Sequence, residues 1–149
     1  MKFPSSSQHE KIIRILVIAL LSLSLTASGA FSTSFNDLIE REGLYYKKFT
    51  DEPFTGSLDE GESWGVLKNG KREGPWVTDY VNGQLSWKGV FKGGKREGPW
   101  VAYWANGQLR FKGAYKNGER EGPWVGYNSD GTKVRDRSGT YRNGEKVSD

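Results

Sequence analysis

The chain has 149 residues, a formal net charge of +4, no cysteine and a single histidine, His9. This length predicts one domain plus a targeting segment. The lack of cysteine excludes disulfides, cysteine-ligated zinc, thiol catalysis and a lipidated N-terminal cysteine. Because His9 lies in the N-terminal segment, a mature form without that segment has no imidazole to act as a general base or a metal ligand.

Residues 1–30 are predicted to be a secretory signal peptide. A basic start over 1–14 is followed by an apolar run over 15–25 and by small residues over 26–30. This order is typical of signal peptides, and cleavage is expected after Ala30, with Gly29 as the alternative, followed by export to the periplasm or the medium. The alternative is an uncleaved N-terminal membrane anchor, although about 20 apolar residues are needed to span a bilayer. Membrane contact is expected only through this segment, if it is uncleaved.

Residues 31–52 are predicted to form an N-terminal lead and a short hairpin. The composition of residues 38–41 and 44–49 favours two short strands around a Glu-Gly turn. A one-turn helix over residues 36–41 is the competing interpretation.

Residues 53–144 are predicted to form a repeat array. One phrase, Gly-Lys-Arg-Glu-Gly-Pro-Trp-Val, stands at 70–77 and 94–101 and, with one change, at 118–125. A second phrase, Asn-Gly-Gln-Leu, stands at 82–85 and 106–109, with a weaker copy at 130–133. Both phrases recur every 24 residues, and a fixed period of this kind predicts stacked structural repeats.

The two ends of the array depart from the pattern. Residues 53–70 are interpreted as a shortened first repeat, in which residues 53–56 are a degenerate copy of the Pro-Trp-Val phrase. In the third repeat the later aromatic positions become Asn128, Lys133 and Arg135, so residues 124–144 are interpreted as a polar C-terminal cap. Residues 145–149 are expected to be a C-terminal tail.

Each repeat is predicted to be a β-hairpin closed by its Asn-Gly pair, because a type I′ turn needs positive φ at both central residues. The pairs expected from a two-residue turn are Trp76–Gly89, Thr78–Trp87 and Tyr80–Leu85, then Trp100–Gly113, Ala102–Phe111 and Trp104–Leu109. A tryptophan opposite a glycine lets the indole lie across the partner backbone. The predicted fold class is therefore all-β, an antiparallel β-hairpin repeat array.

The Gly-Gly and Asn-Gly pairs at 93–94 and 117–118 are predicted to join one hairpin to the next. If the same register continues, Trp87 faces Trp100 and Phe111 faces Trp124. The Gly-Pro pair before each tryptophan indicates a β-bulge, because proline cannot donate to a ladder, so the register between hairpins stays open. The expected turn glycines are Gly70, Gly83, Gly94, Gly107, Gly118 and Gly131.

Alternation of side chains gives each hairpin an aromatic side and a mixed polar side. The aromatic side is expected to be the core, because the chain has few aliphatic residues to bury; a stacking platform for a ligand is the alternative. The expected core residues are Trp76, Tyr80, Leu85, Trp87, Phe91, Trp100, Trp104, Leu109, Phe111, Tyr115 and Trp124.

The polar side is the predicted surface for a partner, since tyrosine and arginine are enriched in protein interfaces. The candidate binding residues are Asp79, Lys88, Tyr103, Arg110, Lys112 and Tyr127. Charges of both signs alternate along the repeats, which favours a solvated face over a nucleic-acid groove. A protein or an envelope component is the expected partner.

No catalytic site, metal site or cofactor is expected. The charged residues that recur once per repeat are Glu73, Glu97 and Glu121 together with Arg72, Arg96 and Arg120. A glycosidase needs two carboxylates in one cleft, whereas these are spread along the array and favour a solvated edge with ion pairs across turns. No phosphate-binding glycine motif precedes a helix, so the chain is predicted not to be an enzyme.

The repeat unit resembles a known family motif. Residues 106–124, which hold the Asn-Gly-Gln-Leu, Lys-Asn-Gly and Glu-Gly-Pro-Trp phrases, resemble the variant MORN repeat that characterises the YwqK-type antitoxin family of bacterial proteins. The resemblance covers about residues 44–144 and implies a MORN-like β-hairpin meander. It also implies roles in protein binding, scaffolding or lipid contact, and the antitoxin label implies neutralisation of a partner toxin.

Three functions are compatible with these features. The preferred hypothesis is an exported, non-catalytic MORN-like repeat protein that binds a protein or an envelope component. The second is a YwqK-like antitoxin or immunity-type protein that neutralises a partner toxin. The third is a cell-wall glycan binder that stacks sugars on its aromatic side.

Overall fold

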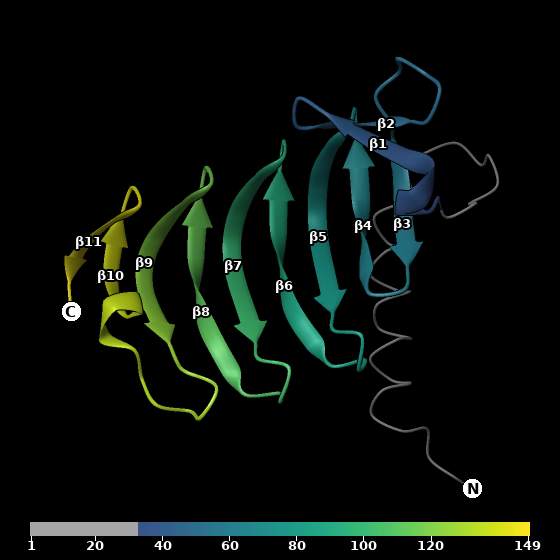
Figure 1. Cartoon of the computed structure of the whole chain (residues 1–149). Coiled ribbons are helices and arrows are strands. Elements are labelled where there is room, and N and C mark those ends of the chain that lie inside the picture. Colours follow the sequence, from purple (N-terminus) through teal and green to yellow (C-terminus); the bar gives the residue numbers. More distant parts are fainter. Residues whose placement is uncertain (1–32) are drawn as a thin grey trace, which may run out of the picture. The chain divides into compact units, whose positions relative to one another are not determined.

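The computed structural model describes residues 33–149, which fall within one compact unit. The predicted signal peptide and its cleavage site lie outside the described residues. Nine strands form one antiparallel sheet in which neighbours in sequence are neighbours in space, so the predicted all-β hairpin meander is confirmed (Figure 1). The strands are β3 (Gly56–Glu60), β4 (Ser63–Lys68), β5 (Lys71–Asp79), β6 (Leu85–Lys92), β7 (Lys95–Tyr103), β8 (Leu109–Lys116), β9 (Glu119–Gly126), β10 (Gly139–Arg142) and β11 (Glu145–Ser148).

A separate hairpin precedes this sheet, as the sequence predicts. Its strands are β1 (Leu38–Arg41) and β2 (Leu44–Lys47), joined by a turn in which Glu42 and Gly43 both have positive φ. The alternative helix over 36–41 is wrong, because only a 3-10 turn, η1 (Phe35–Asp37), comes before the strand. The hairpin is attached to the sheet where the N–H of Tyr45 donates to the carbonyl of Gly70 at 2.9 Å.

The register within each repeat hairpin is confirmed near the tryptophan and wrong near the turn. Trp76 pairs with Gly89, as predicted, but Leu85 pairs with Asp79 instead of Tyr80. The next repeat behaves in the same way: Leu109 pairs with Tyr103 and the predicted Trp104 pair is absent.

The reason is the turn type. The Asn82-Gly83 turn is a three-residue loop in which Gly83 has positive φ and Asn82 does not, so it is not a type I′ turn. Ser86 is then the extra residue of a bulge that restores the two-residue register further along the strands. Two-residue turns with positive φ at both positions occur instead at the opposite ends of the strands, where one hairpin is joined to the next, for example at Asn117-Gly118.

The predicted bulges between hairpins are present. Between β6 and β7, the single residue Gly89 lies opposite the three residues 98–100, and Gly98 has positive φ. Because of this insertion Trp87 pairs with Ala102, so the predicted Trp87–Trp100 register is wrong, although the two rings still stack at 5.0 Å. Strands β5, β7 and β9, which carry these bulges, are visibly bowed (Figure 1).

The same insertion also changes which glycine each indole covers. A Cβ built on Gly89 would lie 2.2 Å from the ring of Trp100, and one built on Gly65 would lie 2.2 Å from the ring of Trp76. Each indole therefore crosses the glycine of the preceding strand, not the glycine of its predicted hairpin partner. The indole N–H of Trp100 also donates to the carbonyl of Val90, at 3.1 Å.

The first repeat begins later than the sequence predicts. Leu58 pairs with Gly65 as Trp76 pairs with Gly89, so Leu58, and not Phe54, is the residue equivalent to the repeat tryptophan. Leu58 is fully buried and belongs to the hydrophobic core.

The last repeat keeps its register by looping out the extra residues. Gly139 pairs with Trp124 although it stands two residues late in the sequence, because a 3-10 turn, η2 (Arg135–Arg137), absorbs the excess. The buried hydroxyl of Ser138 accepts from the N–H of Gly126 and donates to the carbonyl of Val134. Residues 145–148 are not a tail: they form the edge strand β11, which pairs with β10.

Candidate binding surfaces

One face of the sheet carries a continuous ladder of buried rings. The tryptophans Trp76, Trp100 and Trp124 are at most 5% exposed, which leaves no free ring surface at these positions. Neighbouring rings meet edge to face, as between Trp100 and Tyr115 with centroids 5.6 Å apart. The buried cluster consists of Leu38, Phe54, Leu58, Leu67, Trp76, Phe91, Trp100, Tyr115, Trp124 and Tyr141.

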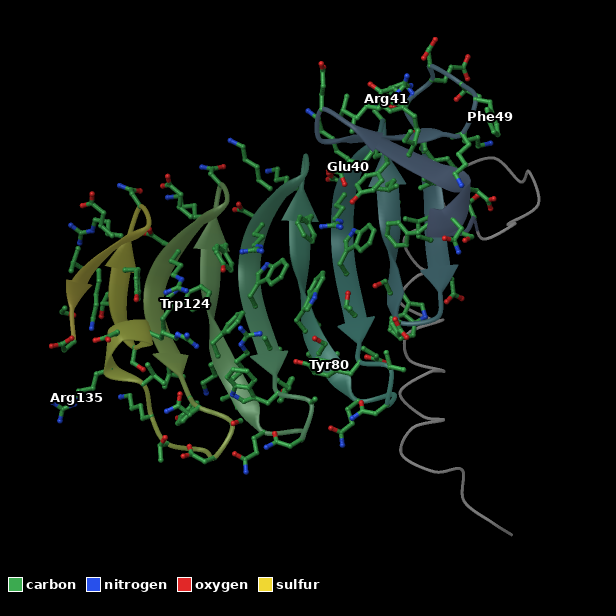
Figure 2. The ribbon with its side chains drawn as sticks, viewed as in Figure 1. Glu40, Arg41, Phe49, Tyr80, Trp124 and Arg135 are labelled. Carbon is green, nitrogen blue, oxygen red and sulfur yellow. The ribbon has the colours of Figure 1, made fainter. Side chains whose placement is uncertain are left out.

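The remaining predicted core residues lie at the margin of this cluster. Trp87 and Phe111 are half-buried and pack against it. Four others are half-buried and do not belong to the cluster: Tyr80, Leu85, Trp104 and Leu109. Tyr80 lies at the strand ends that carry the Asn82-Gly83 and Asn106-Gly107 turns. Its hydroxyl donates to the carbonyl of Tyr103 in the next repeat, at 2.8 Å (Figure 2).

Arginines cover the ring ladder, a role that the sequence did not predict. The guanidinium of Arg96 lies 5.1 Å from the ring centroids of both Trp100 and Tyr115 and donates to the Tyr115 hydroxyl. Arg120 stands in the same way over Trp124 and Tyr141. A cation over an aromatic face is favourable, so these arginines close the outer side of the core while their charges stay near water.

Arg72 connects the repeat array to the N-terminal hairpin β1–β2. The position equivalent to Tyr115 is Phe91, which has no hydroxyl, and the guanidinium of Arg72 donates instead to the hydroxyl of Tyr45 at 3.1 Å. Burial raises the pKa of Tyr45, and the positive charge of Arg72 opposes that rise. The hairpin β1–β2 thus supplies the missing phenol.

The recurring glutamates fasten each hairpin to the next. The carboxylate of Glu97 accepts a hydrogen bond from the N–H of Asn117 at 2.8 Å, and Glu73 does the same for Gly93 at 2.7 Å. Their partners are therefore main-chain groups of the neighbouring turn, rather than the arginines that the sequence suggested. On the opposite edge, the side-chain amide of Asn82 donates to the carbonyl of Ala105.

The other face of the sheet holds an apolar groove with a volume of about 680 Å³. Its lining residues are Pro75, Trp76, Val77, Lys88, Gly89, Val90, Pro99, Trp100, Val101, Lys112, Gly113, Pro123, Trp124 and Val125. Neighbouring residues in a strand point to opposite faces. Lys88 and Val90, which flank Gly89, and Lys112, which precedes Gly113, therefore lie on the face away from the rings. The side predicted to be mixed and polar is thus apolar along its middle.

The candidate binding residues fall into two groups. Lys88 and Lys112 are exposed and line the groove. Arg110 does not line it; its guanidinium lies 4.5 Å over the ring of Trp104. The others, Asp79, Tyr103 and Tyr127, are half-buried and lie outside the groove lining.

A second exposed feature lies in the loop after β2. Phe49 is fully exposed and has a φ of 65°, an uncommon backbone conformation for a bulky side chain. The loop is braced by Arg41, which donates to Asp51 and to the carbonyl of Thr50, both at 2.9 Å (Figure 2). Composition alone did not identify this residue, because its exposure depends on the loop geometry.

Within residues 33–149, no three histidine, cysteine, aspartate or glutamate side chains gather into a group that could hold a metal ion. No helix in this part of the chain is long and apolar enough to span a membrane. No protein-family model matches the chain, and no curated protein matches it significantly.

Proposed function

We propose that the protein is an exported, non-catalytic repeat module that binds a protein or an envelope component through the groove of β5–β9. The observation that carries the proposal is the apolar groove on the sheet face opposite the rings. An exposed apolar surface of this kind, bordered by charged residues, marks interaction sites in soluble proteins. The tryptophan rings are already buried, so they support a structural role and count against a sugar-stacking platform.

Affinity capture of the full-length protein from envelope extract of its source organism tests this function. The wild type is compared with Val101→Glu, which places a carboxylate in the middle of the groove, and with Val147→Glu on the exposed edge strand β11. A specific partner should be recovered with the wild type and Val147→Glu and lost with Val101→Glu, while circular dichroism shows all three folded. A partner retained by a folded Val101→Glu protein would contradict the proposal.

Export is part of the proposal and rests on the basic start, apolar run and small-residue exit of residues 1–30. N-terminal sequencing of protein recovered from the periplasm or the medium should find a start near Phe31. Recovery of only the full-length chain from the cytoplasm would rule export out.

The repeat phrases support a second candidate, a YwqK-like antitoxin or immunity-type protein, because they resemble that family's variant MORN repeat. In this case the groove would hold the toxin. Co-expression with the product of a neighbouring toxic gene should restore growth, and Val101→Glu should abolish the rescue. Equal growth with and without the wild-type protein would exclude this candidate.

A further inference from the structure

We infer that the groove binds an amphipathic helix of a partner protein, in which acidic side chains seven residues apart meet Lys88 and Lys112. This inference rests on the proposed function, since it specifies the partner chemistry of the same groove. It starts from a row of side chains that crosses five strands. The register pairs Val77 with Lys88, Lys88 with Val101, Val101 with Lys112, and Lys112 with Val125.

The positive charge of the groove favours a partner whose contact surface is negatively charged. Lys88 and Lys112 are the charged residues of its lining, and both are exposed. Within residues 33–149, ion pairs join Arg41 to Asp51 and Lys146 to Asp149, and neither groove lysine takes part in them. The nearby carboxylates of Glu73 and Glu97 are outside the lining, where turn N–H groups bind them. The groove thus offers two unpaired cations on an apolar surface.

The spacing of the lysines selects a helix. They stand two strands apart, which places their main chains about 9.6 Å from each other at ~4.8 Å per strand. Seven residues of an α-helix rise about 10.5 Å and return to nearly the same face. Side chains on one face of an extended strand repeat at about 6.7 or 13 Å, and neither distance fits. A helix laid across the strands therefore matches the spacing of the two lysines more closely than one face of an extended peptide does.

The apolar part of the row completes the match. Val101 lies between the two lysines, where the helix residues three and four positions after the first acidic one would rest. Val77 and Val125 end the row, whose total width is about 19 Å, or roughly 13 helical residues. Pro75, Pro99 and Pro123 extend the apolar surface beside it.

Two synthetic helical peptides of about 18 residues test the spacing. Both contain two glutamates and the same leucines, with the glutamates seven residues apart in one peptide and five apart in the other. Fluorescence anisotropy with the full-length protein should show the first binding about two- to fivefold tighter, because it pairs both exposed lysines on one face whereas the second pairs only one. The difference should shrink at high salt, where exposed charges are screened. Equal affinity for the two peptides would overturn the inference.

Charge reversal tests the residues themselves. Lys88→Glu with Lys112→Glu should weaken the seven-spaced peptide about tenfold or more, and a peptide with lysines in place of its glutamates should recover the affinity. The matched control is Lys92→Glu with Lys116→Glu, which changes exposed lysines of the same two strands outside the groove lining. An equal loss in the control, or no loss in the groove variant, would overturn the inference.

The remaining outcomes separate this inference from the proposed function. A captured partner that requires Val101 but binds neither through an acidic helix nor through the lysines would leave the function standing and refute the helix. A partner indifferent to Val101→Glu would refute both. A concentration-dependent dimer in analytical ultracentrifugation, dissociated by Val101→Glu, would overturn the helix by showing that a second copy fills the groove.

Discussion

At the scale of single residues, each repeat places a glycine directly beneath a tryptophan ring. Trp124 lies over Gly113, and its indole N–H donates to the carbonyl of Ala114 at 3.0 Å. Any side chain at Gly113 would occupy the space of the indole, because a Cβ there would be 2.2 Å from the ring. The glycine is required for this close approach, since its own φ is not in the left-handed region.

We predict that Gly113→Val lowers the free energy of unfolding by about 1–3 kcal/mol, the usual cost of forcing a larger group into a packed site. The control is Lys112→Val, which introduces the same side chain one residue away on the opposite, exposed face and should change stability by less than about 0.5 kcal/mol. Thermal and urea melts of both variants provide the comparison. Similar melting temperatures would contradict the position of the indole.

The sequence predicted that tryptophans and glycines face each other, but it assigned each indole to the wrong glycine. The pairing of Trp100 with Gly113 follows from the hairpin turn, and it is present. The path of the indole depends on the two extra residues at Gly98-Pro99, which carry Trp100 across to Gly89 instead. The proline indicates that a bulge exists, but the residue pattern does not fix how many residues it inserts, so the ring position could not be derived.

At the scale of the hairpin, charged and amide side chains connect one turn to the next. Each glutamate of the Glu-Gly-Pro-Trp phrase binds a main-chain N–H of the following turn, as Glu121 does with Asn143 at 3.0 Å. The same hydrogen bond therefore recurs once per repeat, at Glu73, Glu97 and Glu121. The sequence showed that the glutamates recur with the repeat period. It could not identify their hydrogen-bond partners, because every residue type except proline has a backbone N–H group, so the residue pattern does not indicate which one is bound.

We predict that Glu97→Ala lowers stability by about 1 kcal/mol through loss of this hydrogen bond, and that Glu97→Gln, which keeps an acceptor oxygen, retains most of it. Hydrogen exchange at the Asn117 amide should accelerate in the alanine variant. Glu119→Ala is the control, because Glu119 is exposed at the start of β9 and its loss should change the free energy of unfolding by less than about 0.5 kcal/mol. Unchanged protection of Asn117 would refute the role of Glu97.

At the scale of the whole sheet, contacts run chiefly between successive strands, as in a one-dimensional array. The groove lies along this array, and its lysines repeat with the hairpins. The apolar character of the groove was only partly predictable, because the sequence places Val77 and Val90 on that face while the prolines reach it through the bulges. The length of the binding surface therefore depends on how many hairpins are present.

This architecture predicts that one whole repeat can be removed. Deletion of residues 95–118 joins Gly94 to Glu119, so that β6 would pair with β9, Trp124 would cover Gly89, and Glu73 would keep its hydrogen bond to Gly93. The interactions between β6 and β7 would thus be replaced by equivalent ones between β6 and β9. The variant should fold to a β-sheet with one cooperative transition and a lower melting temperature, because one stacking interface is missing.

Deletion of residues 95–114 is the control, since it joins Gly94 to Tyr115 and breaks the 24-residue phase. Circular dichroism and tryptophan fluorescence should show this second variant unfolded or without a cooperative transition. The in-phase variant also lacks Val101 and Lys112, so it should fold yet bind the seven-spaced acidic peptide only weakly, because Lys88 alone remains. Failure of the in-phase variant to fold would mean that the hairpins stabilise one another beyond their nearest neighbours. Full peptide affinity in a folded variant would place the binding site elsewhere on the sheet.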